Sequence, residues 1–151
     1  MIRISLGAAA IAMLALMVSP MGHEHATGIV KERMDGMAAL AKSMKAIGQR
    51  IKTGRGLETM PADAKTMLPI ASKIAEWFPR GTNQHPSEAR TDIWKNWPDF
   101  ETKAHALEAE LSKLGAIDPR DPRTIIAQVR AVTRTCGACH DLYREKKGRG
   151  E

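Results

Sequence analysis

The stretch Cys136-Gly137-Ala138-Cys139-His140 constrains this chain more than any other part of the sequence. On a helix, residues three and four apart share one face, so both thiols and the imidazole project to the same side. Two thiols with this spacing can add to the vinyl groups of a haem, and the imidazole that follows can reach the iron. The motif therefore predicts one haem c, attached through Cys136 and Cys139, with His140 as an axial ligand.

Other chemistries use similar residues. A disulfide or a thioredoxin-like redox pair fits the spacing of the two thiols, but neither requires a His directly after the second Cys. A thioredoxin-like pair also follows a strand, and no alternating apolar pattern is present. A zinc site that recruits His85 or His105 matches no recognised ligand spacing. The chain has two cysteines in all, too few for a four-thiolate zinc or iron–sulfur site, and haem attachment is the preferred interpretation.

Apolar residues recur at helical spacing in four segments of the chain. The motif lies in a predicted helix over residues 123–146, and a helix over residues 98–115 precedes it. A helix over residues 27–52 and a helix that begins near Pro61 come earlier, separated by the break at residues 53–56. Four amphipathic helices joined by mostly short turns predict an all-α, antiparallel four-helix bundle with the haem c on its C-terminal helix.

Each predicted helix has an apolar stripe that we expect to face the core. The expected inner positions are Val30, Met34, Met37, Ala41, Met44, Gly48 and Ile51 with Leu40 and Ile47 in the first helix; Met67, Ile70, Ile74 and Trp77 or Phe78 in the second; Phe100, Ala104, Leu107, Leu111 and Leu114 in the third; and Ile125, Val129, Val132, Cys136, Cys139 and Tyr143 in the fourth. The connection over residues 79–97 lacks periodicity, but Trp94 and Trp97 predict that it packs on the core.

The N-terminus has the pattern of an export signal. Arg3 precedes an apolar run over residues 4–18, which matches a secretory signal and is short for a membrane span. We expect residues 1–22 to be a signal peptide that directs the protein to the periplasm, and residues 23–151 to be the haem domain. An uncleaved segment 4–18 that anchors the protein to the membrane is the alternative.

Composition limits the classes of function. The 151 residues are 43% hydrophobic and 26% charged, as expected for one folded domain, and the formal net charge is +6. A positive surface favours redox partner proteins with acidic docking surfaces. Nucleic acid is a weaker candidate, because Lys and Arg are spread over all four helices and the export signal removes the protein from such a target.

The second axial position of the iron must be filled from upstream, if a side chain fills it. Only eleven residues follow His140, and none of them is Met or His. The candidates are Met34, Met37, Met44, Met60, Met67, His85 and His105. Methionines on a helical stripe are usually core residues, so an iron without a second side-chain ligand remains an alternative.

The chain resembles the class II c-type cytochromes, the cytochrome c prime family, over residues 27–147. The resemblance rests on five features: the haem motif with Tyr143 and Arg144 after it, Phe-Pro-Arg-Gly-Thr at residues 78–82, Ile93-Trp94, Phe100, and the pair Arg33 and Met37 four residues apart. It implies a left-handed four-helix bundle with the haem on the last helix. It also implies Arg33 near a haem propionate, Met37 at the distal face of the iron, and Arg144 beside the proximal imidazole.

The residue at position 37 separates two branches of that family. High-spin members have a non-coordinating apolar residue there, whereas a Met is similar to the low-spin branch, with Met34 as the alternative ligand if the register slips by one turn. Methionine ligation implies one-electron transfer and no enzyme activity. The alternative is a five-coordinate protein that binds nitric oxide or carbon monoxide. The resemblance also implies a homodimer formed through the first two helices.

Overall fold

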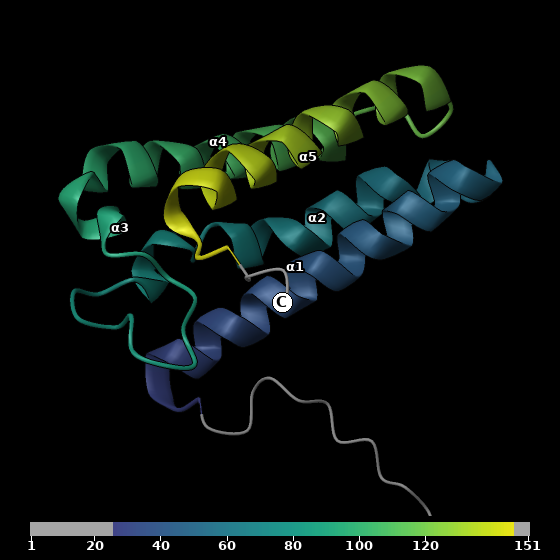
Figure 1. The fold of residues 1–151 in the computed structure, drawn as a ribbon. Helices are drawn as coiled ribbons and strands as arrows, with labels where there is room; N and C mark the ends of the chain where they lie inside the picture. The colour runs from purple at the N-terminus through teal and green to yellow at the C-terminus, as the bar shows by residue number, and fades with distance from the viewer. Residues whose placement is uncertain (1–25, 147–151) are drawn as a thin grey trace, which may run out of the picture.

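The structure is a computed structural model that describes residues 26–146 (Figure 1). The predicted signal segment, residues 1–22, lies outside the described residues. Four long helices, α1 (Gly28–Thr53), α2 (Met60–Ala71), α4 (Trp97–Gly115) and α5 (Pro122–Tyr143), form the bundle. Shorter pieces lie between them: η1 (Leu57–Thr59), η2 (Ala75–Trp77) and α3 (Asp92–Lys95). The predicted all-α four-helix bundle is confirmed, and residues 26–146 contain no strand beyond one isolated bridge.

Helix α1 begins and ends where the sequence predicts, but its buried face is rotated. Gly54 adopts a left-handed conformation with φ of 65°, which ends the helix. The buried residues are Arg33, Leu40 and Ile47, seven residues apart, and Met37 and Met44 border them. Ala41, expected on the inner face, is exposed. The predicted stripe was off-centre because it excluded a charged residue, Arg33, from the core.

Helix α2 is shorter than the predicted second helix. Pro61 lies in its first turn, and Met60, Ala64, Met67 and Ala71 are buried at helical spacing. The helix ends at Ala71, beyond Pro69, whose ring removes one backbone donor. The tighter turn η2 then carries Trp77 into the core.

The connection between α2 and α4 packs on the core, as predicted, and contains a helical turn that the sequence did not indicate. Ile93 and Trp94 of α3 are buried, and the Trp94 indole donates a hydrogen bond to the Phe78 carbonyl over 2.8 Å. Trp97, the first residue of α4, is partly buried. Apolar periodicity does not reveal α3, because the helix is only four residues long.

Helix α5 starts at a capped end and stops three residues before the predicted end. The Asp121 side chain accepts a hydrogen bond from the Thr124 amide over 3.1 Å, and Pro122 follows as the first helical residue. Arg144 is extended and pairs with Ala89 in the isolated bridge. The last turn is therefore replaced by hydrogen bonds to the connection, from Arg90 N–H to Tyr143 O and from Glu145 N–H to Glu88 O.

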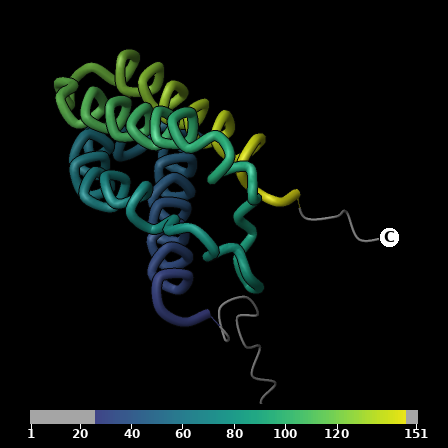
Figure 2. Tube along the Cα trace, turned by 90° about the vertical axis from the view of Figure 1, so that its left-hand side faces the viewer, coloured from purple at the N-terminus to yellow at the C-terminus, as the bar shows by residue number. Residues whose placement is uncertain are grey.

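The four long helices pack in the order α1, α2, α4, α5, so α1 and α5 are the outer helices (Figures 1 and 2). The connection crosses between the N-terminal half of α1 and the end of α5. Gly115 allows a close approach of α4 to α2, since a Cβ there would lie 3.1 Å from Lys65 Cγ. None of the helices within residues 26–146 is both long and apolar enough to span a membrane.

Candidate functional site

The three motif side chains lie together on one side of α5. Cys136 and Cys139 are free thiols, partly buried, and both pack against the hydrophobic core. His140, in the last turn, is exposed. Because the described thiols are not joined as a disulfide, all three groups are available to a single ligand on this face of the helix.

Partial desolvation and one neighbouring charge set the protonation of these groups. Desolvation raises the pKa of the Cys136 thiol, and it raises the pKa of Cys139 to about 11. At neutral pH both are therefore thiols, the form that adds across a vinyl group. Desolvation, and then the positive charge of Arg144, lower the pKa of His140. The imidazole is thus held in its neutral form, which is the form that binds a metal ion.

Helix α1 contributes methionines to the border of the same core. Met37 and Met44 are partly buried and pack against the core cluster, as the two motif cysteines do from α5. Met34 is partly exposed. The two outer helices thus border one apolar core with thioether side chains on one side and the Cys-x-x-Cys-His face on the other, and this residue set fits a haem c.

Arg33 is buried, and both terminal nitrogens of its guanidinium are hydrogen-bonded within the protein. Its two terminal nitrogens donate four hydrogen bonds, to Trp77 O (3.1 Å), Thr82 Oγ1 (3.2 Å), Thr82 O (2.6 Å) and Ser87 Oγ (2.7 Å). The guanidinium also lies over the Phe78 ring, 4.5 Å from its centroid. Arg33 therefore fastens the connection to α1, and its predicted position near a haem propionate stays a prediction.

Arg144 fastens the other end of the connection to α5. Its guanidinium donates to Glu88 Oε2 over 2.7 Å, and its backbone N–H donates to the His140 carbonyl over 3.2 Å. This places the Arg144 charge close enough to His140 to lower the pKa of the imidazole. Arg144 thus lies beside the motif His, while its action on a haem remains a prediction.

An aromatic cluster supports the motif end of α5. Phe100 packs edge-on against both Phe78 and Tyr143, with ring centroids 4.8 and 5.4 Å apart, and Trp97 lies 5.4 Å away. The Tyr143 hydroxyl donates to Asp99, which fixes the last turn of α5 to α4. The sequence showed the aromatic residues but not their meeting point, because that depends on the path of the connection.

The remaining ligand candidates lie elsewhere. Met60 and Met67 are fully buried in α2, whereas His85 and His105 are exposed. Among residues 26–146 no group of three or more His, Cys, Asp or Glu side chains lies close enough to hold a metal ion. The zinc alternative therefore finds no ligand cluster in the described part of the chain.

These features define a class, that of helical-bundle proteins with a c-type haem motif on the last helix. A family profile described as Cytochrome C' matches residues 28–144. A cytochrome c-556 of Agrobacterium tumefaciens (strain II Chrys) is 34% identical over 124 residues, 82% of this chain and 97% of the relative. A cytochrome c' of Alcaligenes xylosoxydans xylosoxydans is 35% identical over 119 residues, 78% of this chain and 94% of the relative. The chain belongs to the cytochrome c' family, and membership implies a covalently bound haem c.

Solved structures agree with this fold. A nitric oxide complex of a mutant cytochrome c prime from Alcaligenes xylosoxidans has a TM-score of 0.69 at 25% identity, covering 79% of this chain and 94% of that one. A cytochrome c' described with a ligand-controlled dimer dissociation has a TM-score of 0.72 at 18% identity, covering 78% of this chain and 95% of that one. These structures support the four-helix bundle. Neither they nor the sequence relatives support the predicted assignment to the methionine-ligated branch.

Proposed function

We propose that this protein carries one haem c, attached through Cys136 and Cys139 and ligated by His140, and that it binds nitric oxide or carbon monoxide on the opposite face. The haem, when bound, supplies an iron with an axial position for a diatomic gas. The protein supplies two neutral thiols for attachment, a neutral imidazole for the proximal face, and apolar α1 side chains for the distal face.

The observation that carries this proposal is the packing of Met37. Its side chain is partly buried and rests against the hydrophobic core, as does Met44 two turns further along α1. Methionine is flexible and often fills irregular gaps in a core. We infer that Met37 serves as apolar packing, so that the distal face takes a small uncharged ligand. The nitric oxide complex of the 25% identical relative is consistent with this inference.

A second candidate is one-electron transfer through a haem ligated by His140 and Met37. The observation in its favour is the identity of residue 37, since a thioether sulfur can complete six-coordination and favour redox chemistry. The buried Arg33 fixes the register of α1 one turn before Met37. In this candidate the sulfur of Met37 would bind the iron instead of packing against apolar side chains.

Absorption spectra of the ferric and ferrous protein separate the two candidates, with Met37→Ala as the test variant and Met44→Ala as its control. The gas-binding proposal expects a high-spin spectrum, ready binding of carbon monoxide at neutral pH, and the same spin state in both variants. A low-spin spectrum that becomes high-spin in Met37→Ala alone would overturn it in favour of electron transfer.

Further predictions accompany the proposal. We expect the protein to be exported to the periplasm, to have no enzyme activity of its own, and to form a homodimer through α1 and α2. If electron transfer is its role, its partners are redox proteins with acidic docking surfaces. Size-exclusion chromatography with light scattering, with and without carbon monoxide, tests the dimer.

A further inference from the structure

Within residues 26–146, the net positive charge is concentrated at one end of the bundle. Dividing each long helix at its middle gives a turn end, residues 41–66 and 107–132, which holds the α1–α2 and α4–α5 turns. The motif end is the rest of residues 26–146. The turn end has ten Lys and Arg residues against six Asp and Glu residues, while the motif end has ten against nine. One motif-end cation, Arg33, is buried, so the net positive charge on the surface of residues 26–146 lies almost wholly at the turn end.

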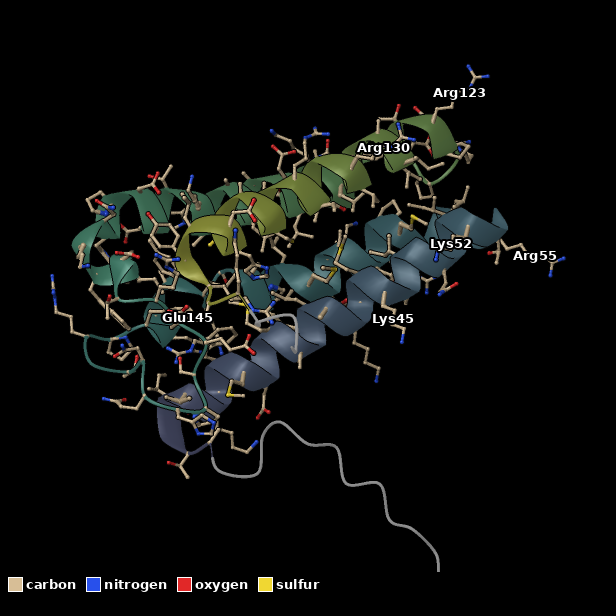
Figure 3. All side chains as sticks on the ribbon, viewed as in Figure 1. Lys45, Lys52, Arg55, Arg123, Arg130 and Glu145 are labelled. Carbon is tan, nitrogen blue, oxygen red and sulfur yellow. The ribbon has the colours of Figure 1, made fainter. Side chains whose placement is uncertain are left out.

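Seven exposed cations of the turn end have no ion pair or side-chain hydrogen bond with the described residues, and Figure 3 labels five of them. The labelled five are Lys45, Lys52, Arg55, Arg123 and Arg130, from α1, the turn after it, and α5; the other two are Lys42 of α1 and Lys65 of α2. The cations near the end of α1 and those of α5 lie at the same end of the molecule, because η1, just after Arg55, packs on α5.

Most carboxylates of the turn end are already engaged within the protein. Asp118 pairs with Arg120, Asp63 with Arg50 and Glu110 with Lys113. Asp121 caps α5, and Glu108 lies near His105. The exposed Glu58 is the exception. The unpaired cations are therefore directed outward with little local compensation.

Helix stability does not explain all of these cations. Lys52 lies in the last turn of α1, where the helix dipole favours a positive charge. Arg123, by contrast, lies in the first turn of α5, where the dipole disfavours one and where no acidic residue is present. A cation kept at such a position contributes nothing to the helix and is free to interact with an external anion.

The chemistry of the turn end fits a lipid surface better than a protein. Protein interfaces rely on buried aromatic or aliphatic anchors, and the one large hydrophobic side chain that is exposed within residues 26–146, Leu142, lies at the motif end. Anionic phospholipid headgroups require only clustered Lys and Arg. We propose that the turn end binds the surface of an anionic phospholipid bilayer.

This orientation directs the haem motif away from the bilayer. From Arg123 to His140 the chain follows α5, a distance of about 25 Å at the helical rise. His140 and Leu142 then face the aqueous side, where gas or a soluble partner reaches them. The turn end is a different surface from the proposed haem site. Failure of the lipid-binding proposal would therefore leave the haem proposal intact, and the reverse also holds.

Flotation of the haem-loaded full-length protein with vesicles tests the proposal. Vesicles of phosphatidylglycerol and phosphatidylcholine are compared with vesicles of phosphatidylcholine alone, at low and high salt. The test variant is Lys52→Gln/Arg55→Gln/Arg123→Gln/Arg130→Gln. The control, Lys31→Gln/Lys73→Gln/Lys95→Gln/Lys146→Gln, removes the same charge from the motif end. All three proteins share the N-terminal segment, so any binding by that segment cancels in the comparison.

We expect binding to anionic vesicles alone, lost at high salt, and weakened by about tenfold or more in the test variant. The control variant should bind as the parent does. The Soret absorption of each variant checks that it is folded and loaded. Absence of binding to anionic vesicles, or equal weakening in both variants, would overturn the proposal; binding to an acidic protein but not to vesicles would assign the turn end to a protein partner instead.

Discussion

The two ends of the bundle differ in how their charged side chains are used. At the motif end, Arg33 and Arg144 fix the connection to the two outer helices, and Tyr143 joins Asp99. At the turn end, seven exposed cations have no described partner, and Figure 3 labels five of them. The difference indicates that charges at the motif end hold positions, as a cofactor site requires, whereas the turn end leaves cations available to an external anion.

The largest expected effect is at the motif itself. The double variant Cys136→Ser/Cys139→Ser has no thiol to add to a vinyl group, so all haem should be extracted by acidified acetone. Gly137→Ala is a suitable control, because a Cβ at that position meets no atom within 4 Å. If haem stays covalently attached to the double variant, Cys136 and Cys139 are not its attachment site.

The next largest expected effect is on stability, at Gly36, where α1 closely approaches Trp77 of η2. A Cβ at Gly36 would lie 2.1 Å from Trp77 Cη2, and Trp77 is buried. We expect Gly36→Ala to lower the free energy of unfolding by about 2 to 3 kcal/mol, measured by urea denaturation. Gly48→Ala, in the same helix with no atom within 4 Å, should instead raise it by up to about 1 kcal/mol. Equal effects of the two changes would contradict the packing of Trp77 on α1.

Removing the guanidinium of Arg33 should release the connection from α1. Arg33→Gln loses hydrogen bonds to Trp77, Thr82 and Ser87, and we expect a loss of about 2 kcal/mol in unfolding free energy. Amide hydrogen exchange should rise most in residues 78–90. Lys31→Gln, which breaks an exposed pair with Asp35, is the control and should change exchange little. If amide exchange in residues 78–90 is the same in both variants, Arg33 does not hold the connection against α1.

The smallest expected effect is on the pH dependence of stability, and it arises from the carboxylate of Asp99. The hydrogen bond from Tyr143 lowers the pKa of Asp99 below its usual value of 3.8. A lowered pKa in the folded state stabilises the protein above the unfolded value, and this contribution is lost as pH falls through the folded one.

Tyr143→Phe should therefore raise the pKa of Asp99, measured by NMR titration, and lower Tm by about 3 °C at neutral pH. The difference in Tm between Tyr143→Phe and the parent should disappear at pH values below the pKa of Asp99 in the folded protein. A Tm difference that is unchanged at acid pH would mean that the aromatic packing, not the hydrogen bond, changed.

The helices were predictable where apolar spacing and capping residues agree. Pro98 and Gly115 mark α4 to within one residue, and Gly54 follows the last residue of α1. The end of α5 was not predictable, since Arg144 leaves the helix to pair with Ala89, a residue more than fifty positions away. Local patterns carry no information on such a pairing.

The haem-attachment motif of the candidate site could be predicted from the sequence, but the contacts that position it could not. Cys136, Cys139 and His140 follow from spacing alone, and the structure brings them to one face. The burial of Arg33 was missed, although its spacing of seven from Leu40 and from there to Ile47 is a signal that a charged residue shares the core stripe. Gly36 opposite Trp77 leaves no such signal, because the contact depends on the path of the connection.

Carbon monoxide titration of the ferrous protein, followed by absorption spectroscopy at neutral pH, tests the central claim most directly. With Met37 packed against the core as an apolar side chain, we predict a high-spin ferrous spectrum that converts fully to the carbon monoxide complex, in the parent and in Met37→Ala alike. A low-spin ferrous spectrum that resists carbon monoxide until Met37 is replaced would contradict the account and assign the sulfur of Met37 to the iron.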